Sequence, residues 1–261
     1  MQNLQIDVKD RVIVVTGGSQ GIGRSIAQAF VSSGAKVIVA DMAAPADLDQ
    51  DAGFSEDNSI FVKTDVTINS SVAAMAEKAL AVYGKIDIIV NNAGIIYKAD
   101  IENIEIQSWQ RLLDVNLTGA VLCTRAVVPA MKKQMWGRII NMSSMQAFMG
   151  SPTYSAYTAS KAALSGLTRV WAAELAPFQI TVNAICPSFV ETPMMAASID
   201  RLAREKSIST AEAKAHFTAP IPQKRILAPE EIAFSALFLS SPLAQGVTGH
   251  DLVVAAGCVM H

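Results

Sequence analysis

The chain alternates between short apolar segments of strand length and longer segments with helical periodicity, and this alternation constrains the fold more than any other feature. The first apolar segment, Arg11–Thr16, is typical of a strand buried on both faces of a parallel sheet. Gly21–Gly34 follows it, with apolar residues spaced along one helix face and a glycine at its end. Repeated units of this kind predict an α/β, Rossmann-like, doubly wound parallel sheet that binds ligands beyond the carboxyl ends of its strands.

The remaining predicted elements continue this order. Further strands are predicted at Lys36–Asp41, Asn58–Lys63, Lys85–Asn91, Gly137–Ser143, Gln179–Cys186 and Asp251–Ala255. Further helices are predicted at Asn69–Tyr83, Ser108–Gln134, Ser155–Ala176, Pro193–Ala219 and Pro229–Ser240. Connections are short except at about residues 192–228, whose charged, alanine-rich composition indicates a mobile lid over the site. We therefore expect residues 1–261 to form a single dinucleotide-binding domain with one lid.

Composition excludes several classes of function. A net charge of −2 provides no basic field for nucleic acid or for an anionic membrane surface. The longest apolar runs have strand length, and Met1–Asp10 lacks an apolar stretch, so neither a membrane span nor a secretory leader is expected. The three cysteines and three histidines show no disulfide or metal-ligand spacing, so we expect no metal and a reducing, cytoplasmic setting.

A glycine-rich turn, Thr16–Gly23, lies between the first predicted strand and helix. Glycine suits such a turn because the backbone must bend tightly, approach a pyrophosphate and let the helix lie close to the sheet. The start of the helix then offers free N–H groups and the positive end of its dipole. The residues expected to contact the cofactor here are Gly17, Ser19, Gln20, Gly21, Ile22 and Gly23. The alternative is a tight turn without a ligand, which the flanking strand and helix disfavour.

Asp41 ends the second predicted strand, 18 positions after Gly23. This is near the spacing of the carboxylate that binds the adenosine ribose hydroxyls in dinucleotide-binding folds. A carboxylate there would repel the 2′-phosphate of NADP, and neither Gln20 nor Met42 supplies a compensating cation. The sequence therefore predicts NAD as the cofactor. The alternative for Asp41 is a solvated acid at a strand end.

Tyr157 and Lys161 lie four residues apart on a predicted helix and so share one face. A free tyrosine has a pKa near 10 and is a poor base at neutral pH. A nearby ammonium group and the cationic nicotinamide of oxidised NAD would both favour the phenolate, and lowering the pKa by about 3 needs roughly 4 kcal/mol. We expect Tyr157 to act as the general acid and base. An ordinary amphipathic helix is the alternative.

Four motifs in this order resemble the short-chain dehydrogenases/reductases, in their compact single-domain branch. They are Thr16–Gly23, Asn91–Gly94, Asn116 in the long middle helix, and Ser144 with Tyr157-x-x-x-Lys161. The resemblance extends from about Lys9 to Gly257. It implies that Lys161 also binds the nicotinamide ribose, that Ser144 holds the substrate oxygen and that Asn116 positions water in a proton relay. Ser144 is preferred to Ser143 because its spacing of thirteen residues before Tyr157 is typical of the family.

The resemblance also implies further cofactor contacts. On the adenosine side these are Asp65, Val66, Asn92, Ala93 and Gly94, and on the nicotinamide side Pro187, Val190 and Thr192. Ser188 stands where the family usually has glycine, and Val254–Gly257 departs from the usual Val-Asp-Gly-Gly. Family tetramers suggest that the long middle helices are buried between subunits, so we expect a homotetramer.

The substrate pocket is expected to include Ser144, Gln146, Tyr154 and Phe189. Tyr154 has no lysine one helical turn later, so a place in the pocket wall suits it better than a catalytic one. The segment Trp136–Ser144 and the lid resemble the hydroxybutyrate dehydrogenases. However, the expected pocket positions hold no cation to bind a carboxylate, which favours a neutral, apolar or cyclic secondary alcohol.

The sequence thus predicts an NAD(H)-dependent oxidoreductase that interconverts a secondary alcohol and a ketone. Hydroxy-acid and polyol or sugar dehydrogenases are the alternatives within the same chemistry. A sugar-nucleotide epimerase or dehydratase would favour a different glycine spacing and a longer C-terminal domain. A non-catalytic NAD-sensing protein would lack one or more of Ser144, Tyr157 and Lys161, all of which are present.

Overall fold

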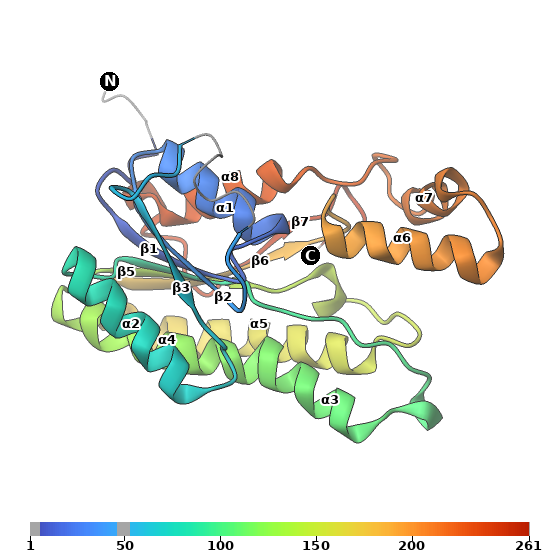
Figure 1. Ribbon diagram of the computed structural model, residues 1–261, viewed down its shortest axis with the longest axis horizontal. Helices are drawn as coiled ribbons and strands as arrows, with labels where there is room; N and C mark the ends of the chain where they lie inside the picture. The colour runs from blue at the N-terminus through green and yellow to red at the C-terminus, as the bar shows by residue number, and fades with distance from the viewer. Residues whose placement is uncertain (1–5, 46–52, 261) are drawn as a thin grey trace.

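The computed structural model describes residues 6–45 and 53–260, which form a three-layer α/β sandwich (Figure 1). Residues 1–5, which belong to the segment judged free of a leader, lie outside the described residues. The strands are β1 (Val12–Thr16), β2 (Lys36–Asp41), β3 (Ser59–Lys63), β4 (Ile88–Asn91), β5 (Gly137–Met142), β6 (Ile180–Pro187) and β7 (Asp251–Val254). The α-helices are α1 (Gly21–Ser32), α2 (Asn69–Tyr83), α3 (Ile106–Leu113), α4 (Gly119–Lys133), α5 (Ser155–Leu175), α6 (Pro193–Lys206), α7 (Thr210–Thr218) and α8 (Pro229–Ser240).

All strand pairs in the sheet are parallel, in the order β3-β2-β1-β4-β5-β6-β7. The chain proceeds outward from β1 to β3 and then returns to place β4 on the other side of β1. This reversal opens a crevice beyond the carboxyl ends of β1 and β4, the place where doubly wound sheets bind ligands. The predicted Rossmann-like fold is confirmed.

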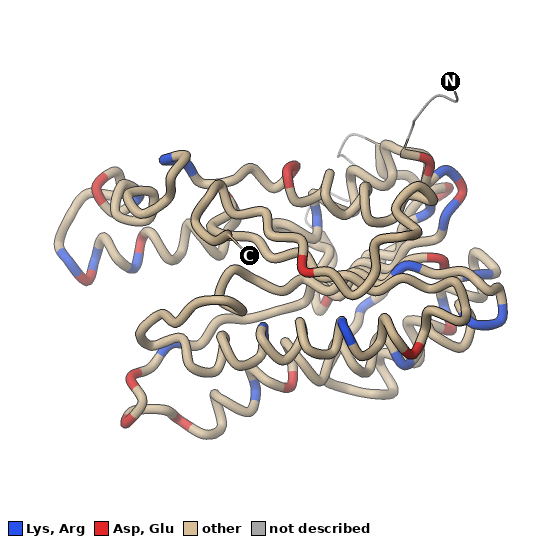
Figure 2. The backbone as a smooth tube through the Cα atoms, turned by 180° about the vertical axis from the view of Figure 1, so that it is seen from behind, with Lys and Arg blue, Asp and Glu red and all other residues tan. Residues whose placement is uncertain are grey.

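Two apolar cores explain why the central strands are almost continuously hydrophobic. On one face, α1 and α8 cover the sheet through residues such as Phe30 and Ile232. On the other face, α2, α4 and α5 cover it through residues such as Met75 and Val127. Every residue of β1 and of β6 is buried, as expected for strands enclosed between helices. Charged positions lie mostly in loops, at helix ends and along α6 and α7 (Figure 2).

Two predicted helices differ from the observed ones. The stretch predicted from Ser108 begins at Ile106 and contains a π-helical turn at Asp114–Thr118, between α3 and α4. The stretch predicted as one helix at Pro193–Ala219 is two helices. Ser207, at φ +52°, ends α6, and Ser209 begins α7 with a capping box to Glu212.

Among the described residues, Ile106–Gln134 forms a continuous helical stretch that is long and apolar enough to cross a membrane by length and composition alone. The sequence prediction considered only uninterrupted apolar runs and therefore missed this stretch. In the structure, Cys123, Val127 and Met131 on its inner face are buried in the core formed with the sheet. The α4 part of this stretch, together with α2 and α5, thus covers one face of the sheet.

Candidate active site

The turn from β1 to α1 has a backbone that only glycine fits well. Gly17 and Gly21 adopt φ values of +62° and +55°, which are strained for residues with a side chain. A Cβ atom on Gly23 would lie 2.2 Å from the Gly17 carbonyl oxygen. The following helix, α1, has no side-chain cap and no acidic residue in its first turn. Its first N–H groups and its positive dipole end are therefore left for an anionic ligand.

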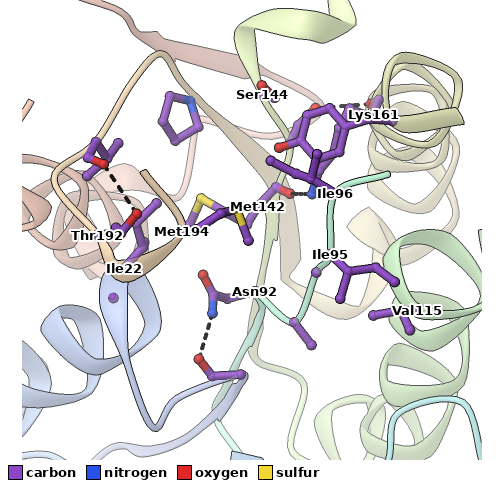
Figure 3. Close-up of a pocket in the computed structure, with 18 of the residues that line it drawn as sticks. Ile22, Asn92, Ile95, Ile96, Val115, Met142, Ser144, Lys161, Thr192 and Met194 are labelled. Atoms are coloured by element: carbon purple, nitrogen blue, oxygen red, sulfur yellow. Dashed lines mark hydrogen bonds between the residues drawn. The ribbon is translucent and has the colours of Figure 1, made fainter. Parts of the chain in front are cut away.

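Asn92 fixes this turn from β4. Its Nδ2 donates to the carbonyl oxygens of Thr16 at 2.9 Å and Gly17 at 3.0 Å, and the second contact joins the tip of the turn to the sheet (Figure 3). The Thr16 hydroxyl in turn accepts the backbone N–H groups of Asn92 and Ala93. Asn91, by contrast, points away and bonds to Asn141 and Thr124 in the core. Within this segment, Asn91 thus supports the core while Asn92 fixes the glycine-rich turn.

Asp41 is held rigidly at the carboxyl end of β2. One carboxylate oxygen accepts the Ser19 N–H at 3.0 Å, and the other accepts the Met42 N–H at 2.7 Å. In the described part of the chain, two cations line the same cleft, Arg111 of α3 and Lys161 of α5. Neither forms an ion pair with Asp41. The carboxylate therefore presents an uncompensated negative charge to this end of the cleft.

Asp65 and Val66 lie beside Asp41 in the cleft wall, directly after β3. Asp65 accepts both the backbone N–H and the hydroxyl of Thr67, at 2.9 and 2.7 Å. Val66 lies close to α4, where a Cβ on Gly119 would come within 2.8 Å of the valine methyl group. These contacts fix the residues that the resemblance assigns to the adenine end.

Ser144, Tyr157 and Lys161 meet at the other end of the cleft. Ser144 follows β5, and its hydroxyl is hydrogen-bonded to Tyr157. Lys161 lies one turn after Tyr157 on α5, with its Nζ 5.5 Å from the centre of the tyrosine ring and 2.6 Å from the Met142 carbonyl oxygen (Figure 3). Ser143 instead donates to the Lys161 carbonyl oxygen and contacts Ser165 in the core. The geometry thus separates the two adjacent serines as expected.

The pKa values of this group differ from the sequence-based expectation. Burial raises the pKa of Tyr157 to about 12, and its hydrogen bond with Ser144 acts in the opposite direction without overcoming burial. Burial also lowers the pKa of Lys161 to about 8. We expected the Lys161 ammonium to lower the pKa of Tyr157, but the loss of hydration on burial dominates and raises it, and the neighbouring Tyr154 acts in the same direction. Burial therefore stabilises the neutral phenol.

Asn116 lies in the π-helical turn between α3 and α4 and is buried. Its Oδ1 accepts the Ile95 N–H at 2.8 Å, and its Nδ2 donates to the Ile95 carbonyl oxygen at 3.0 Å and approaches Ser160 Oγ at 3.4 Å. The side chain thus ties the segment after β4 to the helix. Because the side-chain amide is already hydrogen-bonded to Ile95, only the backbone of Asn116 would be available to bind water in a proton relay.

The segment after β6 closes the cleft from the lid side. Thr192 caps α6 by accepting the Met195 N–H, and it faces the glycine-rich turn so closely that a Cβ on Gly21 would lie 3.3 Å from its methyl group. Ser188 donates its N–H to the Val254 carbonyl oxygen and does not adopt a left-handed conformation. The serine in place of the family's usual glycine therefore leaves the turn intact.

These elements enclose one cleft of about 910 Å³. Of the predicted site residues, it is lined by Gly17, Gln20, Gly21, Ile22, Asp41, Asp65, Val66, Asn92, Ala93, Gly94, Ser144, Gln146, Tyr154, Tyr157, Lys161, Pro187, Phe189, Val190 and Thr192. Ser19, Gly23 and Asn116 do not line the cleft; Gly23 and Asn116 are buried, whereas Ser19 is partly exposed. The Tyr154 ring stands edge-on to the Tyr157 ring, with centres 6.1 Å apart.

Two cations near the substrate end were missed by the sequence prediction. Lys98 follows the Asn91–Gly94 segment, and its Nζ lies 4.3 Å from the centre of the Tyr154 ring. Arg201 of α6 lines a second cavity beside Tyr154 together with Lys98. Neither belongs to a motif, and they meet only because α6 lies over the segment after β4, so no spacing could have identified them. The described residues contain no group of three or more potential metal ligands.

Comparisons with known proteins agree with this architecture. The family described as enoyl-(acyl carrier protein) reductase matches residues 17–259. The chain is 38% identical to an uncharacterized oxidoreductase of Bacillus subtilis (strain 168), over 96% of this chain and 98% of the relative. It is 34% identical to the D-beta-hydroxybutyrate dehydrogenase of Rhizobium meliloti (strain 1021), over 95% and 98%. The solved structure of ligand-free aldohexose dehydrogenase from Thermoplasma acidophilum superposes with a TM-score of 0.86 at 34% identity, covering 96% of this chain and 94% of that one.

The matches to these relatives cover almost the whole of both chains, and the solved structure has the same overall fold. The chain is therefore an oxidoreductase that belongs to the short-chain dehydrogenase/reductase family.

Proposed function

We propose that the chain is an NAD(H)-dependent oxidoreductase that interconverts a secondary alcohol and a ketone. The observation that carries this proposal is the placement of Ser144, Tyr157 and Lys161 at one end of a cleft whose other end is the uncompensated carboxylate of Asp41. The uncapped start of α1 lies between these ends and suits a pyrophosphate. The cleft thus offers complementary chemistry for each part of a dinucleotide.

The residues that would hold the cofactor follow from this placement. Asp41, Asp65 and Val66 would bind its adenosine end, the N–H groups of Gly21 and Ile22 its phosphates, and Lys161 and Thr192 its nicotinamide end. The carboxylate of Asp41 supports NAD over NADP because a 2′-phosphate beside it would meet like charge without a cation. When bound, the oxidised cofactor supplies the hydride acceptor for the carbinol carbon.

The chain's own residues manage the alcohol proton. Ser144 and Tyr157 can both hydrogen-bond the substrate oxygen, which fixes the carbinol carbon at the nicotinamide end of the cleft. During oxidation the hydroxyl proton passes to the Tyr157 oxygen, and during reduction the same phenol returns a proton to the carbonyl oxygen. Lys161 favours the tyrosinate through its charge. The α6–α7 segment acts as a lid that excludes water from this reaction.

The two neighbouring tyrosines provide a matched test. Tyr157→Phe removes the proton-transfer group but keeps the ring, so we expect turnover to fall by roughly 10²–10⁴ while NADH binding, followed by fluorescence, stays nearly intact. Tyr154→Phe should alter the apparent substrate affinity and leave turnover within about tenfold. Alcohol oxidation should rise with pH in the unmodified enzyme, and any residual activity of Tyr157→Phe should lose that dependence. Normal turnover of Tyr157→Phe with an inactive Tyr154→Phe would show that the catalytic face of α5 is misassigned.

We also propose a homotetramer, because α5 and α8 carry apolar side chains on their outer faces. Phe234 and Phe238 of α8 are 62% and 40% exposed, and Val170 of α5 is 51% exposed. Exposed aromatic side chains on one helix are typical of a surface that another subunit covers.

A further inference from the structure

A second cavity adjoins the substrate end of the cleft. It has a volume of about 310 Å³. Its walls share Gln146, Tyr154, Phe189, Ser198 and Phe217 with the cleft. A ligand whose reacting end lies at Ser144 and Tyr157 can therefore extend past Tyr154 into this space. The cavity is thus placed to bind the far end of a substrate.

The cavity carries an excess of positive charge. Lys98 and Arg201 both line it, and Glu205 is the acid that lines it with them. Arg201 is paired with Glu205 at 3.6 Å, whereas among the described residues no carboxylate lies within ion-pairing distance of Lys98. Burial and the charge of Arg201 lower the pKa of Lys98 to about 8, and Glu205 opposes this only in part. Lys98, Arg201 and Glu205 together carry a net charge of about +1 when Lys98 is protonated. A ligand with a single negative charge would neutralise this charge, whereas a dianion such as a phosphate ester would leave an excess of negative charge.

A buried amide adds a polar contact at the boundary between the two spaces. Gln146 is only 6% exposed, and its Oε1 has no hydrogen-bond partner, while its Nε2 donates to Ser151 Oγ at 3.0 Å. The Ser151 hydroxyl can either donate or accept, so the amide can turn and present an N–H group to a ligand without losing this bond. A buried polar atom without a partner is costly, and in the turned amide Oε1 would accept from the Ser151 hydroxyl while Nε2 donates to a ligand's oxygen.

The distances limit the length of the ligand. Lys98 Nζ lies 4.3 Å from the centre of the Tyr154 ring, and the centres of the Tyr154 and Tyr157 rings are 6.1 Å apart. Lys98 Nζ therefore lies at most about 10.4 Å from the centre of the Tyr157 ring. Such a span suits a carboxylate separated from the carbinol carbon by several bonds or by a ring. The rings of Tyr154 and Phe189 border the path between the two ends.

We infer that the substrate is a hydroxy acid, or the corresponding keto acid, whose carboxylate binds Lys98 and Arg201 while its hydroxyl binds Ser144 and Tyr157. This inference rests on the proposed redox function and refines it. It also reverses the preference for a neutral alcohol, because the cations that the sequence prediction sought at Gln146 and Tyr154 come from other elements.

The kinetic test compares two alcohols that differ only in the carboxylate, 4-hydroxycyclohexanecarboxylate and cyclohexanol. We expect kcat/KM with NAD to be at least 100-fold higher for the acid. Lys98→Met and Arg201→Met should each lower kcat/KM for the acid by roughly 10- to 100-fold, mainly through KM, and leave cyclohexanol within about threefold. Arg204→Met, an exposed change on the same helix, is the matched control and should change neither. Equal efficiency with both alcohols, or acid kinetics unaffected by Lys98→Met, would overturn the inference.

A binding test separates this inference from the redox assignment. Calorimetry with the NADH-bound chain should show that cyclohexanecarboxylate binds, that Lys98→Met weakens its binding, and that its affinity falls as the pH rises through about 8. The other charged or titratable groups facing Lys98 are Arg201, Glu205, His216 and Tyr154. Tighter binding of cyclohexyl phosphate than of the carboxylate would overturn the monoanion assignment. Specific carboxylate binding without any oxidation of the hydroxy acid would leave the subsite in place and refute the proposed reaction instead.

Discussion

Lys161→Met should make the protein more stable and inactive at the same time. Lys161 is 4% exposed, and burial lowers its pKa from 10.5 to about 8. Holding the charged form in the fold at pH 7 therefore costs roughly 3 to 4 kcal/mol. Methionine has a similar shape and no charge, but it leaves the Met142 carbonyl oxygen without the hydrogen bond from Nζ, at a cost of about 1.5 kcal/mol. We expect a net gain of about 2 kcal/mol in the free energy of unfolding.

Denaturant and thermal unfolding at pH 7 would measure this gain, which corresponds to a rise of about 4 °C or more in Tm for a chain of this size. The gain should depend on pH in a defined direction. Between pH 8 and 10.5 the folded wild-type chain has lost the Lys161 proton while the unfolded chain still holds it. Wild-type stability therefore rises with pH over this range by about 1.4 kcal/mol per pH unit, so its deficit of about 2 kcal/mol relative to Lys161→Met should disappear near pH 9.5 and reverse by pH 10.5.

Lys133→Met, an exposed change near the end of α4, is the control and should alter stability by less than about 0.5 kcal/mol. A Lys161→Met variant that is less stable than wild type at pH 7 would refute the reasoning, as would a difference that stays constant up to pH 10.5. Either result would mean that the contacts of the Lys161 ammonium compensate its burial.

Three further outcomes are expected. The wild-type enzyme should have a kcat/KM at least tenfold higher with NAD than with NADP, a difference of about 1.4 kcal/mol. Asp41→Asn keeps an acceptor for the Ser19 N–H but removes the charge, so it should narrow that ratio. Equal efficiency of the wild type with both cofactors would contradict the assignment. Gln179→Gly should raise the free energy of unfolding by about 1 kcal/mol, because Gln179 is exposed and strained at φ +59°. Gly84→Ala should lower the free energy of unfolding by a similar amount in the same assay, because Gly84 adopts φ +75° and has open space around it. Sedimentation at micromolar concentration should show a tetramer, and a 27.7 kDa species would exclude it.

The architecture could be predicted from sequence because its determinants are local. The strands of the sheet are short apolar runs, and helices α1, α2, α5 and α8 begin and end near the expected residues. The break between α6 and α7 was missed although Ser209 and Glu212 carry the spacing of a capping box. The alanine-rich sequence on both sides of Ser207–Ser209 favours helix, so the sequence prediction continued one helix through these residues. The π-helical turn at Asp114–Thr118 leaves no such signal, because it depends on contacts of Asn116 with the distant Ile95.

The candidate site was predictable where a motif fixed the spacing and not where separate elements meet. Ser144, Tyr157 and Lys161 were found because two of them share a helix face and the third lies at a typical distance before them. Lys98 and Arg201 are 103 positions apart in the sequence and meet only because α6 lies over the segment after β4. Burial, which sets the charge state of Tyr157, is likewise a property of the assembled fold.

The opposite pKa changes of Tyr157 and Lys161 indicate a directional preference in the chemistry. With a pKa of about 12, Tyr157 is protonated throughout the neutral range and can give a proton to a carbonyl oxygen without further preparation. Oxidation needs the tyrosinate, which burial disfavours. A unit positive charge at a distance on the order of 5–6 Å contributes roughly 3 kcal/mol at an effective dielectric constant near 20, which would increase the tyrosinate population about 100-fold. In the proposed reaction an oxidised nicotinamide would supply such an additional charge. In the proposed reaction the proton acceptor would thus form mainly beside the oxidised cofactor, so one buried tyrosine could serve both directions although burial alone keeps it protonated.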